Sequence, residues 1–179
     1  MRRILVSGIS GAGKTTLATI LAAHWALPRY ELDALRHGPG WVPRAEFVSD
    51  VERFAATDAW ITEDQYYEKV GPLLWSRADT VIWLDLPRTT IMHRVIRRSV
   101  ARALTRRELW NGNRESVRDW LDPDHPIRHA WARHAQRRRQ IEARIPAYPH
   151  VSVIRLRTAA EAAAWLRGIQ AVGRGLNAP

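Results

Sequence analysis

The sequence contains no cysteine, and only two of its 28 basic residues, Lys14 and Lys69, are lysines. The absence of cysteine excludes disulfide scaffolds, zinc sites with thiolate ligands and catalysis by a thiol. Long apolar runs are also missing, because none approaches the ~18 residues that a membrane-spanning helix needs. Met1-Arg2-Arg3 leads straight into a strand-like run, without the apolar region of a signal peptide. We therefore expect a cytoplasmic protein with no membrane partner.

Length and charge favour one globular domain with an uneven surface. The chain has 179 residues, 46% of them hydrophobic, and a net charge of +10, which suits a single core. Residues 88–144 carry fifteen arginines against six acids, whereas residues 1–87 carry nine basic and eleven acidic side chains. Such an arginine excess indicates an anionic partner, a phosphate, nucleotide or nucleic acid, because guanidinium groups bind oxyanions bidentately. The alternative is an arginine-rich set of solvated helix faces.

Apolar runs alternate with amphipathic segments along the chain. The apolar runs predict strands at residues 2–7, 29–32, 60–62, 80–85 and 151–156. The amphipathic segments predict helices at residues 15–25, 44–57, 88–107, 127–145 and 159–168. This alternation predicts an α/β protein, a five-stranded parallel sheet with helices on both faces. Turn-forming and polar residues at 108–124 indicate a loop or lid.

A glycine-rich segment lies between the first predicted strand and helix. Gly8-Ile-Ser-Gly-Ala-Gly-Lys-Thr15 fits the pattern G-x-x-x-x-G-K-[ST] of a P-loop. In such a loop, backbone N–H groups surround a polyphosphate, Lys14 reaches the β- and γ-phosphates, and the Thr15 hydroxyl binds Mg²⁺. A dinucleotide-binding loop is excluded because Thr16 stands where its third glycine would be. The motif predicts ATP or GTP binding by Gly8, Ser10, Gly11, Ala12, Gly13, Lys14, Thr15 and Thr16.

A P-loop site also needs an acid beside the Mg²⁺ ion, at the end of a neighbouring strand. The candidates are Asp33, Glu63, Asp64 and Asp85, each of which ends or follows a predicted strand. Glu63 and Asp64 have the best position, and we assign Glu63 to the metal together with Thr15. Asp85 reads equally as a cap before the next helix. Asp33 is either a helix cap or the group that contacts an acceptor hydroxyl, as a base or as an orienting residue.

Several further motifs resemble those of adenylate-kinase-like P-loop proteins, and more closely those of the branch labelled DNA topology modulation proteins. The segments that carry the resemblance are the P-loop, Leu32-Asp33-x-Leu35, Pro39-Gly40-Trp41, Trp60-Ile61 with Tyr66, residues 80–88, Arg94-Val-Ile-Arg-Arg98-Ser99 and residues 108–116. The resemblance implies a nucleoside-monophosphate-kinase-like fold in one domain, with an acceptor-side insertion at residues 34–57 and a lid at residues 100–126.

The resemblance also implies roles for four arginines. Arg94 and Arg98, four residues apart on one helix face, would lie against the nucleotide base and the terminal phosphates. Arg114 and Arg118 would be lid arginines that close over the transferring phosphoryl group. The run Arg137-Arg-Arg139, by contrast, reads as an exposed basic face.

Two departures from the related pattern fall on the acceptor side. Glu63-Asp64-Gln65 stands where the related proteins have Asp-Gly-Asn, and His37 stands near the place of a tryptophan. The sequence thus favours an ATP-dependent phosphotransferase that acts with Mg²⁺ on a small acceptor, a nucleotide or a nucleoside-like molecule. The alternatives are a nucleic-acid-associated ATPase and a nucleotide-binding regulator that affects DNA topology.

Overall fold

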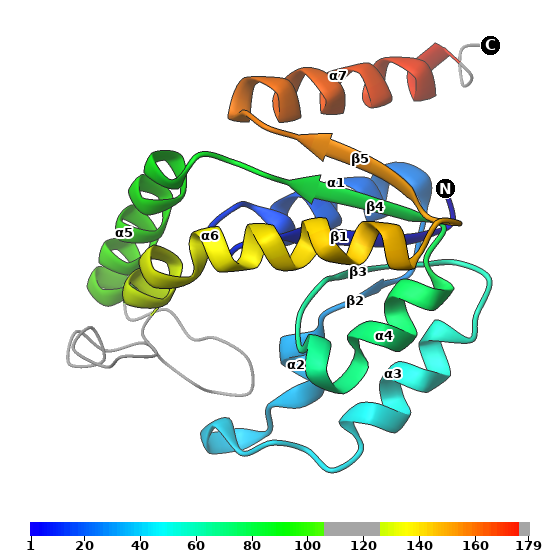
Figure 1. Cartoon of the computed structure of the whole chain (residues 1–179), viewed down its shortest axis with the longest axis horizontal. Coiled ribbons are helices and arrows are strands. Elements are labelled where there is room, and N and C mark those ends of the chain that lie inside the picture. Colours follow the sequence, from blue (N-terminus) through cyan, green and yellow to red (C-terminus); the bar gives the residue numbers. More distant parts are fainter. Residues whose placement is uncertain (106–125, 176–179) are drawn as a thin grey trace.

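The computed structural model describes residues 1–105 and 126–175. Within these residues the chain forms a parallel sheet of five strands in the order β2-β3-β1-β4-β5 (Figure 1). The strands are β1 (Arg3–Gly8), β2 (Arg29–Tyr30), β3 (Trp60–Glu63), β4 (Thr80–Leu84) and β5 (Ser152–Leu156). The α/β fold with a five-stranded parallel sheet that the sequence predicts is therefore confirmed.

Helices cover both faces of the sheet, with α6 in front of the strands and α1 behind them in Figure 1. The helices are α1 (Lys14–Trp25), α2 (Leu32–Arg36), α3 (Phe47–Ala55), α4 (Tyr67–Arg77), α5 (Arg88–Thr105), α6 (Pro126–Arg144) and α7 (Ala159–Gly175). Two short 3₁₀ helices span Pro39–Trp41 and Ile145–Ala147. In the described part of the chain, no helix is both long and apolar enough to cross a membrane.

Alternate residues of the central strands build two separate cores. Ile4 and Val6 of β1 belong to the core under α1 and α5, whereas Leu5 belongs to the core on the opposite face. Val81 and Trp83 of β4 join Leu5 in that second core, under α3, α4 and α6. Successive side chains of a strand point to opposite faces. The strands therefore lack polar alternation because both of their faces are buried.

The C-terminal ends of the strands meet at one edge of the sheet. Val6 of β1 pairs with Glu63 of β3, and Gly8 pairs with Leu84 of β4. The loop after β1 therefore starts between the ends of β3 and β4. In parallel α/β sheets this edge is where ligands bind.

The structure adds two helices that the sequence pattern does not predict. The five-residue α2 begins directly after β2, which ends at Tyr30 rather than at residue 32. The helix α4 contains Gly71 and Pro72, two residues that ordinarily argue against a helix interior. Gly71 is required there, because a Cβ atom would lie 2.2 Å from Cδ2 of Tyr67.

Candidate active site

The P-loop has the backbone conformation of a phosphate-binding loop. Gly8, Gly11 and Gly13 have φ angles of 147°, 84° and 98°, a region that favours glycine. A Cβ atom at Gly8 would lie 2.9 Å from the carbonyl oxygen of Leu84, and one at Gly11 would lie 2.3 Å from Cγ2 of Val95. Glycine is therefore required at positions 8 and 11 by close packing as well as by backbone angle.

The start of α1 leaves its backbone N–H groups available to a ligand. Gly13 precedes the helix, and no side chain caps it. The exposed Thr15 and Thr16 occupy its first turn. Because the N-terminal N–H groups of a helix lack partners within the helix, they bind anions. Ser10 and the buried Ala12 complete the loop, in which the N–H of Ala12 donates to the carbonyl of Ile9 at 3.1 Å.

Lys14 is buried under this loop, with 7% of its surface exposed. Its Nζ atom donates to the Ile9 carbonyl at 3.3 Å. Burial lowers the pKa of Lys14, an effect that the nearby carboxylate of Glu63 opposes and the guanidinium of Arg137 adds to. Among the described residues no carboxylate lies within ion-pair distance of Lys14, an arrangement that suits a bound phosphate.

Two of the four candidate carboxylates form ion pairs with arginines. Asp64, 2% exposed, receives hydrogen bonds from the Ser7 hydroxyl at 2.6 Å and from Arg137 at 2.8 Å. The guanidinium of Arg144 lies 3.4 Å from the same carboxylate. Asp85 accepts two hydrogen bonds from Arg155, at 2.9 and 2.7 Å. Both acids therefore act as anchors between elements of the fold.

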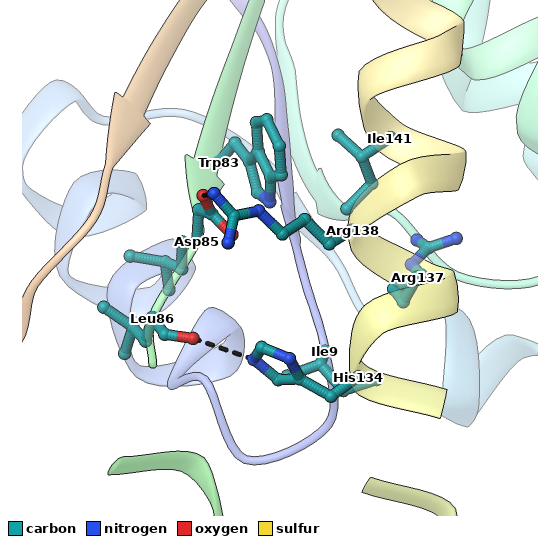
Figure 2. A pocket seen from close by; sticks show the side chains of 9 residues that line it. Ile9, Trp83, Asp85, Leu86, His134, Arg137, Arg138 and Ile141 are labelled. Atoms are coloured by element: carbon teal, nitrogen blue, oxygen red, sulfur yellow. Dashed lines mark hydrogen bonds and ion pairs between the residues drawn. The ribbon is translucent and has the colours of Figure 1, made fainter. Parts of the chain in front are cut away.

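The Asp85 anchor borders a small hollow between the end of β4 and α6. Figure 2 shows the Arg138 guanidinium against Asp85, and the two groups form an ion pair of 3.3 Å. His134, also on α6, donates from Nε2 to the carbonyl of Leu86 at 2.9 Å. The hollow has a volume of about 10 Å³. This is room for about one water molecule, so it does not hold a nucleotide.

Glu63 is the acid that best fits a Mg²⁺ ion. It is 7% exposed, and its nearest cation is Arg29, 4.0 Å away. The carboxylate of Glu63 and the hydroxyl of Thr15 are oxygen donors of the kind that Mg²⁺ prefers. Among the described residues no three His, Asp or Glu side chains gather as a metal cluster. A nucleotide site does not need such a cluster, because phosphates and water supply the other ligands.

Asp33 lies in the first turn of α2 and is held by Tyr66. The Tyr66 hydroxyl donates to Oδ1 of Asp33 at 2.6 Å, and Nε2 of Gln65 lies 3.4 Å from Oδ2. The imidazole of His37 contacts the Tyr66 hydroxyl at 2.9 Å. Burial and the Asp33 carboxylate both raise the pKa of Tyr66 far above its ordinary value. Tyr66 therefore keeps its proton and stays a donor.

Arg94 of α5 reaches the P-loop. Its Nη1 atom donates to the carbonyl of Ala12 at 2.8 Å and would lie 3.5 Å from a Cβ atom on Gly13. The side chain thus lies against the backbone that would surround the phosphates. A guanidinium at this place can reach the terminal phosphates of a nucleotide in the loop.

Comparisons with solved structures identify the fold. Shikimate kinase from Acinetobacter baumannii, in complex with shikimate, matches with a TM-score of 0.52 and 16% identity, over 100% of this chain and 96% of that chain. A gluconokinase from Sinorhizobium meliloti 1021 matches with a TM-score of 0.50 and 16% identity, over 98% and 93%. The chain has a P-loop kinase fold. No family model and no curated protein matches the sequence.

Three of the arginines predicted for this kinase fold cannot be placed at the site. Arg98 lies on α5, but its side chain is not among those described. Arg114 and Arg118 lie outside the described residues. Of the four arginines that the resemblance implies, only Arg94 is seen against the P-loop.

The sequence prediction gives no role at the site to one arginine that lies near the P-loop. Arg137 is not an exposed residue of a basic face: its side chain is 17% exposed and binds both the backbone carbonyl and the carboxylate of Asp64. Its charge acts on Lys14. The signal in the sequence is the stripe of Arg137, Ile141 and Arg144, spaced four and three residues apart and thus on one helix face. The adjacent arginines at 137–139 make this spacing hard to recognise in the sequence.

Proposed function

We propose that this protein binds ATP on its P-loop and transfers the γ-phosphoryl group to a hydroxyl of a small acceptor molecule. The observation that carries the proposal is the placement of Lys14 and Asp33 at the same edge of the sheet, because Lys14 begins the helix after β1 and Asp33 follows the C-terminal end of the parallel strand β2. The first group suits the phosphates of the donor, and the second suits the hydroxyl of the acceptor.

The transfer forms a bond between the acceptor oxygen and the γ-phosphorus while the bond to the leaving ADP oxygen breaks. Asp33 accepts the proton of the acceptor hydroxyl. Lys14 and Arg94 neutralise the phosphate oxygens, and the predicted roles of Arg98, Arg114 and Arg118 in the lid proposed at residues 100–126 would add positive charge there. Thr15 and Glu63 would hold Mg²⁺, which would supply positive charge beside the phosphates.

Arg36 favours an acceptor that carries a negative group. Its guanidinium lies 5.0 Å from the ring centroid of Tyr66 and 5.5 Å from that of Phe47. Among the described residues no carboxylate lies within ion-pair distance of it, although the side chain is half-buried. A desolvated guanidinium held by aromatic rings suits a phosphate or carboxylate on the ligand. The residues at 34–57 would then bind the acceptor, in agreement with a nucleotide-like substrate.

The proposal is tested by measuring ADP release with nucleoside monophosphates, nucleosides and small hydroxy acids as acceptors. We expect turnover that depends on one of these classes. DNA at physiological salt is the parallel assay, because the net charge of residues 88–144 favours a nucleic-acid-associated ATPase as the second candidate. Stimulation by DNA alone contradicts the kinase, and ATP binding without any turnover points to a nucleotide-binding regulator. The support for a relation to DNA topology modulation proteins comes from the sequence motifs alone.

Arg36→Met separates the acceptor classes. We expect it to raise the KM for anionic acceptors about 10-fold or more, because one charge-assisted contact is lost. The KM for neutral acceptors should stay the same. Arg53→Met on α3 is the matched control, since Arg53 is exposed and its ion pair is with Asp50. An equal change for charged and neutral acceptors would show that Arg36 does not read the charge of the ligand.

A further inference from the structure

A chain of hydrogen bonds connects α2 with the start of α4. The Tyr66 hydroxyl has a single hydrogen, and the 2.6 Å contact assigns it to Oδ1 of Asp33. The contact of 2.9 Å between His37 and the same hydroxyl must then be donated by Nε2–H of the imidazole. The chain therefore has one direction, from His37 through Tyr66 to Asp33.

The surroundings keep His37 and Tyr66 in place. The ring of Trp41 meets the imidazole of His37 edge-on, with 5.4 Å between centroids, and Phe47 meets the Tyr66 ring in the same way at 5.4 Å. Each imidazole and phenol ring thus has an aromatic neighbour that limits its rotation. Edge-on aromatic pairs are favoured because the positive edge of one ring meets the negative face of the other.

The backbone of Tyr66 is strained. Its φ and ψ angles of 50° and 42° are left-handed, a conformation that brings Cβ of a non-glycine residue too close to the following carbonyl oxygen. It stands directly before α4, at the turn that brings the phenol ring back over α2. Strain of this kind persists where the surrounding structure holds a side chain in a required place.

We propose that Tyr66 and His37 are positioning residues for Asp33: Tyr66, itself bound by His37, holds Oδ1 of the carboxylate and leaves Oδ2 directed at the acceptor hydroxyl. The inference rests on the proposed function, in which Asp33 receives the proton of that hydroxyl. Oδ1 is held by a full-strength hydrogen bond, whereas in the described part of the chain Oδ2 is approached only by Gln65 at 3.4 Å, so the second oxygen is the one that can accept. Holding the base in one rotamer removes an entropic cost from the transfer step.

Other charged groups surround the chain from each neighbouring element. They are Lys14 of α1, Arg36 of α2, Glu63 of β3 and, at the beginning of the segment that leads into α3, Arg44, which pairs with Asp50 at 3.3 Å. None of these groups has a hydrogen bond to Asp33 among the contacts described. The orientation of Asp33 therefore depends mainly on Tyr66 and on the His37 contact behind it.

The test is Tyr66→Phe, with Tyr67→Phe as the matched control on the next residue. We expect kcat to fall about 10- to 100-fold in Tyr66→Phe, because the base loses its fixed orientation. The KM for ATP should be unchanged. The acid limb of the kcat profile should move to higher pH, because the ionised base has lost a hydrogen-bond donor. A purely structural role of the hydroxyl would lower the melting temperature without moving that limb.

His37 supplies a second, independent readout. His37→Gln keeps an N–H donor and should retain most of the kcat that His37→Leu loses. In the wild-type protein, ¹⁵N NMR should show a proton on Nε2 of His37, whose Nδ1 atom lies 3.4 Å from the carbonyl oxygen of Trp41. Tyr66→Phe should shift the Nε2 resonance, because that proton loses its acceptor.

The outcomes separate the two proposals. A wild-type protein without acceptor-dependent turnover contradicts the proposed function, and this inference with it. Acceptor-dependent turnover that Tyr66→Phe lowers no more than Tyr67→Phe contradicts the inference alone. Equal activity of His37→Gln and His37→Leu removes His37 from the chain and leaves Tyr66 as the positioning residue.

Discussion

Lys14 is held in a site that disfavours its own charge. Burial lowers its pKa from the ordinary value of 10.5, and the carboxylates nearby only oppose that effect. A cation whose pKa is lowered by folding destabilises the folded state at every pH at which it stays protonated. An anion that binds beside the ammonium group offsets this cost in free energy. Lys14 is thus a residue whose function and stability are opposed.

Lys14→Met should therefore lower the activity and raise the stability of the protein. Turnover of ATP should fall about 10²–10³-fold or more, because the phosphates lose a charged donor in a buried site. The free energy of unfolding should rise, since a buried cation is replaced by an apolar side chain of similar length. This gain should be largest below the lowered pKa of Lys14 and shrink as the pH rises toward 10.5.

Denaturation by urea at several pH values, beside an ADP-release assay, measures both effects. Lys69→Met is the control, because Lys69 is exposed on α4 and is the other lysine of the chain. Normal turnover in Lys14→Met would contradict the placement of the phosphates on this loop.

Single residues of the P-loop could be predicted because their pattern is local. Gly8, Lys14 and Thr15 stand at fixed spacings, and the structure places them at the end of β1 and the start of α1 as that pattern requires. Their roles in catalysis stay predictions. Arg137 and Arg144 could not be predicted in the same way, because their partner Asp64 lies 73 and 80 residues away. Spacing on a helix indicates which residues share a face, but it does not indicate what that face meets.

At the scale of the elements, α6 is tied to β3 by two buried ion pairs. Arg137 and Arg144 both bind Asp64, and Ile141 between them is buried in the core. The guanidinium of Arg144 also lies 3.3 Å from the ring centroid of Tyr67 on α4. Both arginines bind the carboxylate of Asp64, the residue directly after Glu63. The position of α6 therefore depends on the end of β3.

A double-mutant cycle measures that link. Asp64→Asn and Arg137→Met should each lower the free energy of unfolding by about 1–3 kcal/mol, because a buried charge loses a partner. The double variant should be more stable than the sum predicts, with a coupling energy of about 1–3 kcal/mol. Arg139→Met, an exposed neighbour on the same helix, should add independently to Asp64→Asn. Additive effects of Asp64→Asn and Arg137→Met would show that the ion pair carries no net stability.

Helices were harder to predict from sequence than strands. The central strands β1, β3 and β4 are short runs buried on both faces, and this gives a clear pattern. The helix α4 was missed because Gly71 and Pro72 mark a break in most sequences, and here Pro72 lies just past the first turn, where a single donor is lost. The helix α7 extends to Gly175 rather than ending at residue 168. Gly168 was taken as its end, yet a Cβ atom there would meet no atom within 4 Å.

For the whole molecule, the charge excess is divided between internal anchors and surface. Arg137, Arg138 and Arg144 of α6 pair with acids of the strand ends. Arg133 and Arg139 are exposed on the same helix, and among the described residues neither has an acid within ion-pair distance. The internal pairs account for part of the arginine content that residues 88–144 show in the sequence. The exposed ones are available to any polyanion.

Salt dependence distinguishes this surface from a specific nucleic-acid site. We expect DNA binding at low salt to weaken steeply as salt rises, with a slope of about −0.9 per neutralised phosphate. Joint substitution of Arg133→Gln and Arg139→Gln should lower that slope by about 2 and leave ATP turnover unchanged. Binding that persists at physiological salt with the double variant would mean that another surface recognises DNA.

Two of the anchors join parts of the chain that are far apart in sequence. Asp64 meets Arg137 across 73 residues, and Asp85 meets Arg155 across 70. Synthesis runs from the N-terminus, so β1, α1, β3 and β4 leave the ribosome before α6 and β5. We therefore expect the strands β1, β3 and β4 with α1 to form before α6 docks. A chain emerging from the ribosome would then carry a formed phosphate loop while its partner arginines are still being synthesised.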